Sequence, residues 1–220
     1  MGSLNDRRMI VIVSPEARGR GYGLQIWHAG LAYLAGRNIG LDGVVDQQDN
    51  YKKSGFKLAY RNVRFQGVGG GDCPRGRGIV DLTSIPFSVL EDYDHPFHPD
   101  QRSAFLKAWV SQPESQALGI RDSDKLCGYG VIRRCRNGYK VGPLFADTAD
   151  MAESLFLALK SSIGMGQPVF LDVPEVNDVA VEMAERHGMQ AVFETARMYN
   201  REIPDMPTRR IFGVTSFEVG

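Results

Sequence analysis

Residues 18–23, Arg-Gly-Arg-Gly-Tyr-Gly, have the residue types and the spacing that could bind a phosphate group. The continuously apolar residues 9–13 precede them, a turn at Ser14-Pro15 intervenes, and a helical pattern of apolar residues follows directly. Backbone N–H groups at the start of a helix form a concave anion site, and glycines let an anion approach where Cβ atoms would block it. The stretch therefore predicts a loop that binds a pyrophosphate.

Two arginines, Arg18 and Arg20, add positive charge to this loop. We interpret both as phosphate contacts, and the alternative is that they lie in a solvated turn. A second cluster of glycine and arginine, at residues 68–78, lacks the strand before it and the helix after it. A phosphate loop needs both flanking elements, so residues 68–78 are interpreted as a linker.

The spacing of the apolar residues predicts the elements around the loop. In the first part of the chain the order is strand, loop, helix, strand, short helix and strand, at residues 9–13, 18–23, 23–36, 39–45, 46–54 and 57–65. The glycine-rich residues 68–78 fit neither period, and we place a domain boundary there. The predicted division is residues 1–67, a linker at 68–78, and a second unit at 79–220.

The second unit is predicted to begin with a strand, two helices and three strands. These lie at residues 79–83, 87–94, 100–110, 116–121, 126–134 and 138–145. A capping box of Asp150 and Glu153 predicts the next helix, and Asn177 is expected to cap a further one. The remaining strands are predicted at residues 169–173, 189–199 and 211–219.

The composition limits the classes of function that fit this chain. Its 220 residues carry 26 lysines and arginines against 26 aspartates and glutamates, so a dedicated binder of nucleic acid or of an anionic membrane is not expected. No apolar run approaches the ~20 residues of a membrane span. The three cysteines, Cys73, Cys127 and Cys135, have no C-x-x-C spacing and indicate reduced thiols in a cytoplasmic protein.

Two motifs in the first unit resemble those of the GNAT superfamily of N-acetyltransferases. The superfamily's cofactor loop has the form Arg/Gln-x-x-Gly-x-Gly/Ala, and residues 18–23 match it. Its later motif ends in Tyr-x-Lys-x-Gly-Phe, and residues 51–56, Tyr-Lys-Lys-Ser-Gly-Phe, match that ending. The two motifs follow one another at the spacing that the superfamily's fold expects.

The resemblance implies an α+β (α/β) chain with the GNAT acyl-CoA N-acyltransferase fold, a mixed central sheet flanked by helices, in one partial and one complete repeat. Residues 1–67 resemble the C-terminal half of a GNAT domain, because only eight residues precede the strand at 9–13. Residues 79–220 resemble a complete but degenerate GNAT-like domain of the tandem type. Its loop at 142–148 has one glycine, a proline, and Asp147, which would repel phosphate.

In GNAT enzymes an amine attacks the thioester directly, so the resemblance implies acetyl-CoA as co-substrate and a small-molecule amine as acceptor. It gives Tyr51 a catalytic role as the proton donor for the leaving thiolate; the alternative is a surface aromatic. A phenol suits this role because its O–H stays neutral at pH 7. The residues implied to bind the cofactor are Ile12, Val13, Arg18, Gly19, Arg20, Gly21, Tyr22 and Gly23.

The sequence names no general base, which the superfamily often places on strands that precede residue 9. The nearby carboxylates Glu16, Asp42 and Asp46 are interpreted as solvated loop groups. Asp172 is interpreted as a cap or turn residue, with an acceptor site in the second unit as the alternative. Two histidines around Pro96 lack a third ligand at a suitable spacing, so no metal site is predicted.

Two functions of different classes fit these observations. The first is an acetyl-CoA-dependent N-acetyltransferase of a small amine. The second is a non-catalytic protein that keeps the degenerate domain as a binding or dimerisation module, since half of the first domain is missing. The apolar edge at residues 9–13 also needs a cover, either by contact between the two units or by a second copy in a homodimer.

Overall fold

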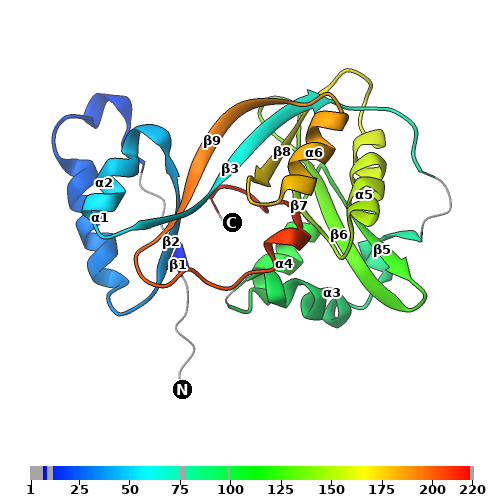
Figure 1. The fold of residues 1–220 in the computed structure, drawn as a ribbon, viewed down its shortest axis with the longest axis horizontal. Coiled ribbons are helices and arrows are strands. Elements are labelled where there is room, and N and C mark those ends of the chain that lie inside the picture. Colours follow the sequence, from blue (N-terminus) through cyan, green and yellow to red (C-terminus); the bar gives the residue numbers. More distant parts are fainter. Residues whose placement is uncertain (1–6, 9–11, 75–77, 99, 219–220) are drawn as a thin grey trace.

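In the computed structural model, strand β3, Lys57–Val68, lies between two strands from the far end of the sequence (Figure 1). It pairs antiparallel with β8, Pro168–Pro174, along one edge and with β9, Gln190–Tyr199, along the other. The structure describes residues 7–8, 12–74, 78–98 and 100–218. Within these residues, the insertion of β3 joins both parts of the chain into one mixed sheet.

The other strands of the described residues are β1 Arg7–Arg8, β2 Ile39–Val44, β4 Ile79–Asp81, β5 Ser115–Asp122, β6 Lys125–Arg134, β7 Tyr139–Ala146 and β10 Ile211–Gly213. Their order across the sheet is β1-β2-β9-β3-β8-β7-β6-β5-β4, and β10 adds to β7. β1 is parallel to β2, and β7 is parallel to β8. The remaining pairs are antiparallel. Among them, β2 pairs with the edge of β9 that faces away from β3.

Helices cover this sheet on both faces and at one end. The α-helices that the structure describes are α1 Tyr22–Tyr33, α2 Gln48–Lys53, α3 Phe87–Asp94, α4 Ser103–Val110, α5 Ala149–Ser161 and α6 Asp178–Arg186. α1 and α2 lie together at the end of the sheet that holds β2 (Figure 1). The four later helices pack around β5 to β8.

Alternation of side chains along β7 produces two separate cores. Leu144 and Ala146 pack on one face with Leu155 of α5. Phe145, between them, points to the opposite face and stacks on Phe97 beyond α3, with 4.1 Å between the ring centroids. α5 and α3 therefore cover opposite faces of the same strands.

A third, smaller core lies at the other end of the sheet. Leu34, Leu41 and Phe56 of the first part of the chain are buried there against Ala196 and Met198 of β9. Each of these five side chains is less than a tenth exposed. Among the described residues, the first part of the chain thus buries its apolar side chains against β9, a strand that comes far later in the sequence.

The sequence predicted most helices and strands within a few residues, and it predicted α3 with its observed bounds. Asn177 caps α6 as expected, with its side-chain oxygen accepting from the backbone N–H of Ala180. The capping box of α5 was wrong. Thr148 caps that helix, and Glu153 instead lies 2.8 Å from the His187 ring.

The last strand is shorter than predicted. β10 ends at Gly213, because the backbone N–H of Val214 then donates to the carbonyl of Asp172 and the chain leaves the β7 edge. In the strand expected at 9–13, residues 9–11 lie outside the described residues, and Ile12 and Val13 are not in a strand. The cover of that edge, the boundary at 68–78 and the two repeats stay predictions.

Residues 1–67 expressed alone should not fold. Within the described residues, β3 pairs only with β8 and β9, and both of these lie outside that fragment. We expect no cooperative transition when the fragment is heated or titrated with urea and followed by circular dichroism, whereas the whole chain should unfold cooperatively. A soluble fragment that melts cooperatively as a monomer would contradict the role assigned to β9.

Candidate functional site

Residues of both sequence motifs line one cleft at the α1 end of the sheet. The cleft has a volume of about 460 Å³, and its lining residues are Ile12, Val13, Arg18, Gly23, Leu24, Trp27, Gln47, Asn50 and Tyr51. The structure thus brings five of the predicted site residues together. The other four, Gly19, Arg20, Gly21 and Tyr22, lie in the adjoining loop and at the start of α1 and are not part of the lining.

The loop between residue 18 and α1 leaves backbone N–H groups available at the start of the helix. Gly21 precedes α1 with a left-handed φ of 79°, and no side chain caps this end of the helix. The side chain of Arg18 turns back, and its Nε donates to the carbonyl of Val13 at 3.2 Å. This bond ties the loop to the segment before it, and a helix N-terminus without a side-chain cap suits an anion.

Tyr51 reaches the cleft from α2 and is held by aromatic packing. Its ring lies 5.4 Å from the ring of Trp27 and 6.5 Å from that of Phe56, between centroids. Trp27 is fixed in turn by a hydrogen bond from its Nε1 to Ser54 Oγ, 3.0 Å long. Burial raises the pKa of Tyr51, so its hydroxyl keeps its proton at neutral pH. No hydrogen bond to that hydroxyl is found within the described part of the chain.

The three carboxylates expected as solvated loop groups differ from one another. Glu16 and Asp46 are exposed, in agreement with that expectation. Asp42 is not, because it lies on β2 with its side chain 1% exposed and paired with Arg197 of β9. Arg197 donates from two nitrogens to the Asp42 carboxylate, and Asn62 of β3 donates a third hydrogen bond to it, 2.8 Å long. The sequence missed this pair because Arg197 lies on β9, 155 residues after Asp42.

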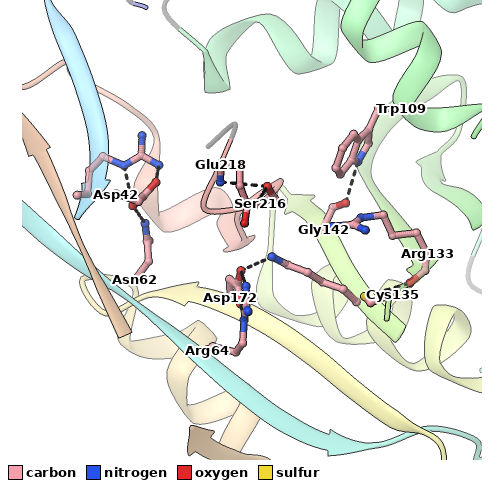
Figure 2. A network of polar contacts seen from close by, with 12 residues as sticks. Asp42, Asn62, Arg64, Trp109, Arg133, Cys135, Gly142, Asp172, Ser216 and Glu218 are labelled. Carbon is pink, nitrogen blue, oxygen red and sulfur yellow. Dashed lines mark hydrogen bonds and ion pairs between the residues drawn. The ribbon is translucent and has the colours of Figure 1, made fainter. Parts of the chain in front are cut away.

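Asp172 was also misjudged, because it is neither a cap nor a turn residue. It is fully buried on β8 and accepts two hydrogen bonds from Arg64 of β3, of 2.7 and 2.8 Å, and it contacts the ammonium group of Lys140 (Figure 2). A charged residue between Leu171 and Val173 in an apolar strand was the signal that the sequence offered. A buried charge of this kind requires a partner.

The second predicted loop, at residues 142–148, is filled by the protein itself. The carboxylate of Asp147 accepts a hydrogen bond from the hydroxyl of Tyr93 at 2.9 Å and pairs with Arg210. The indole of Trp109 donates to the carbonyl of Gly142 at 2.9 Å (Figure 2). Thr148 caps α5. This helix start therefore carries a carboxylate and a side-chain cap where a phosphate would need free N–H groups.

The residues that the structure describes give little support for a metal site, a membrane-spanning helix or a disulfide bond. Among them, no group of three His, Cys, Asp or Glu side chains could hold a metal ion. None of the helices found there has the length and hydropathy needed to cross a membrane. The three cysteines are free, with Cys73 exposed, Cys127 buried and Cys135 half-buried.

Comparison with known sequences gives two findings. A family model described as "Acetyltransferase (GNAT) domain" matches residues 90–213, which run from α3 to β10. Holothin acyltransferase from a Pseudoalteromonas strain is 29% identical to this chain over 209 residues, which cover 95% of this chain and 71% of that protein. The family match does not include the residues that line the cleft.

Comparison with solved structures supports the same fold. A structure from Pyrococcus horikoshii, described as that of an acetyltransferase, has a TM-score of 0.82 and 22% identity and covers 100% of this chain and 74% of its own. A GCN5-related N-acetyltransferase from Kribbella flavida has a TM-score of 0.57 and 15% identity and covers 88% of this chain and 51% of its own. At these identities the likeness concerns the fold alone.

Gly43→Ala should disturb the cleft through Tyr51. A Cβ at Gly43 would lie 2.7 Å from two ring carbons of Tyr51, so the ring has to move and its packing on Trp27 is lost. We expect a loss of about 1–3 kcal/mol in the free energy of unfolding, measured by urea titration and tryptophan fluorescence. The control is Gly164→Ala, where the nearest atom would be 3.7 Å away. Equal stability of the two variants would disprove the contact.

Proposed function

The chain belongs to the family of GNAT acetyltransferase domains, and from this premise we propose that it transfers the acetyl group of acetyl-CoA to an amine of a small molecule. The observation that carries the proposal is the cleft in which Arg18, Gly23 and Tyr51 meet, since these residues come from two separate motifs. Acetyl-CoA supplies an activated acyl group as a thioester. The chain's own residues would bind it, orient it and manage the protons.

The N-terminus of α1 is the proposed site for the pyrophosphate. The N–H groups that follow Gly21 have no side-chain cap, and Arg18 and Arg20 add positive charge near them. Ile12 and Leu24 are 81% and 60% exposed on the cleft and offer apolar surface for the pantetheine arm. A pocket with apolar walls and a few polar groups is typical of sites for small molecules and cofactors.

Tyr51 is the proposed proton donor. Transfer of the acetyl group to an amine releases a thiolate, which a nearby neutral phenol can protonate. The raised pKa of Tyr51 supports this role because the donor must hold its proton until the thiolate forms. The tilted packing on Trp27 and Phe56 limits the positions that the ring can take.

The amine acceptor is supported by family membership and by the relative that is named for acyl transfer to holothin. The free thiols fit the proposed cytoplasmic location. The second candidate, a non-catalytic binding or dimerisation module, is not favoured by any contact among the described residues. It is the outcome to accept if acetyl-CoA binds and no amine is acetylated.

Gly21→Val should abolish or strongly weaken acetyl-CoA binding. Valine at a φ of 79° is strained, so the loop must change its path and the N–H groups before α1 lose their arrangement. Calorimetric titration with acetyl-CoA should show an affinity at least tenfold lower than that of the unmodified chain. Gly166→Val is the matched control, because Gly166 has a φ of 77° and equally open surroundings but lies far along the chain, after α5. Unchanged affinity in Gly21→Val would refute the assignment.

Tyr51→Phe should slow acetyl transfer and leave the affinity for CoA nearly unchanged. The phenylalanine keeps the ring packing and removes only the hydroxyl, and loss of a proton donor costs about 10²–10⁴ in rate. The comparison is kcat by release of free thiol and Kd by calorimetry, with Tyr33→Phe as control because Tyr33 is 87% exposed. Full activity of Tyr51→Phe would make Tyr51 a structural residue only.

A further inference from the structure

Two cations share one buried carboxylate on the polar face of the central strands. Arg64 uses its Nε and one terminal nitrogen on Asp172, and Lys140 contacts the same carboxylate from β7. Asp172 is fully buried, while the side chain of Arg64 is 27% exposed. With both cations charged, these three groups carry one positive charge in excess. Solvent reaches the cluster at Arg64, because the Lys140 side chain is only 5% exposed.

The end of the chain lies over this cluster. The ring of Phe217 lies beneath both cations, 4.5 Å from the Arg64 guanidinium carbon and 5.1 Å from the Lys140 ammonium nitrogen. Glu218 follows, and its carboxylate is oriented by the hydroxyl of Ser216 (Figure 2). Hydrogen bonding and the charges of Lys140 and Arg64 lower the pKa of Glu218 against the opposing effect of its partial burial.

The position of Glu218 indicates what the excess charge attracts. No ion pair within 4 Å joins Glu218 to either cation among the described residues, so the carboxylate is close but is not locked in place. The remaining terminal nitrogen of Arg64 and the other protons of Lys140 have no partner in the described hydrogen bonds. Donors of this kind, next to an aromatic ring, are suited to a carboxylate.

We propose that Arg64 and Lys140 form a binding site for the carboxylate of a small molecule, and that Glu218 occupies its vicinity when no ligand is present. The site is electrostatically incomplete without an anion, because Asp172 neutralises only one of the two cations. The ligand class is a small organic acid, with Phe217 as the apolar contact beside its carboxylate.

The site's place in the fold shows how it relates to the cleft. Asn62 is two residues before Arg64 on the same face of β3, about 7 Å away along the strand. Asn62 hydrogen-bonds Asp42 of β2, and the next residue, Gly43, carries the Tyr51 ring against its opposite side. Asp42 and Gly43 are consecutive residues of β2, so Arg64 and Tyr51 lie on opposite faces of the sheet. The carboxylate site is therefore separate from the cleft, whose lining includes neither Arg64 nor Lys140.

The test measures binding of propionate to the whole chain by ligand-observed NMR, with propionamide as the neutral probe of the same shape. Glu218→Gln removes the competing carboxylate, and the Kd for propionate should fall about tenfold if Glu218 blocks the site nine-tenths of the time. Glu182→Gln, on α6, is the charge-matched control and should behave as the unmodified chain. Propionamide should not bind any of them.

Lys140→Met in the Glu218→Gln background tests the cations. Methionine replaces the apolar stem of lysine, and Arg64 still neutralises Asp172, so the fold is retained while the excess charge disappears. The gain in propionate affinity should be lost. The site is refuted if Glu218→Gln and Glu182→Gln bind propionate equally, or if Lys140→Met leaves the gain intact. Acetyl-CoA titration of the same variants judges the proposed function separately, because propionate binding does not require the thioester.

Discussion

The pairing of β3 between β8 and β9 is the constraint on which the rest of the structure depends. β3 is the strand that connects β8 to β9, and without it the sheet would end at β8 and lose β9 and β2. The same pairing places Arg64 opposite Asp172 and Asn62 near Asp42. It also aligns the outer edge of β9 for β2, against which α1, α2 and the cleft are built. One strand therefore positions both the cleft and the polar face.

Local patterns in the sequence predicted the elements well, because helices and strands follow from periodicity and caps. Asn177 was identified as a cap because the signal lies within three residues of the group it bonds. The cap of α5 was assigned to Asp150 although Thr148, two residues earlier, has the required extended backbone. The strand at 211–219 was overextended because its end depends on a bond from Val214 to distant Asp172. Such long-range pairings leave no periodic trace in the sequence.

In the candidate site, too, local motifs were predicted and long-range pairings were not. The motif residues meet in one cleft, so the two motifs that resemble those of the GNAT superfamily located Arg18, Gly23 and Tyr51 near one another. Their binding and catalytic roles stay predictions. The ion pairs of Asp42 and Asp172 were not predicted, because an isolated carboxylate in a sequence does not identify its partner. Their burial could be anticipated only where apolar neighbours such as Leu171 and Val173 surround the charge, and their partners only from the fold.

The position of β3 also determines the order in which the protein can be completed on the ribosome. β3 is synthesised long before β9, its partner, and about 120 residues separate their ends. At about 5–20 residues per second, the delay is on the order of ten seconds. During that time the apolar side chains around Leu41 and Phe56 have no β9 to pack against. The nascent chain thus passes through an interval in which chaperones that bind apolar segments have access to it.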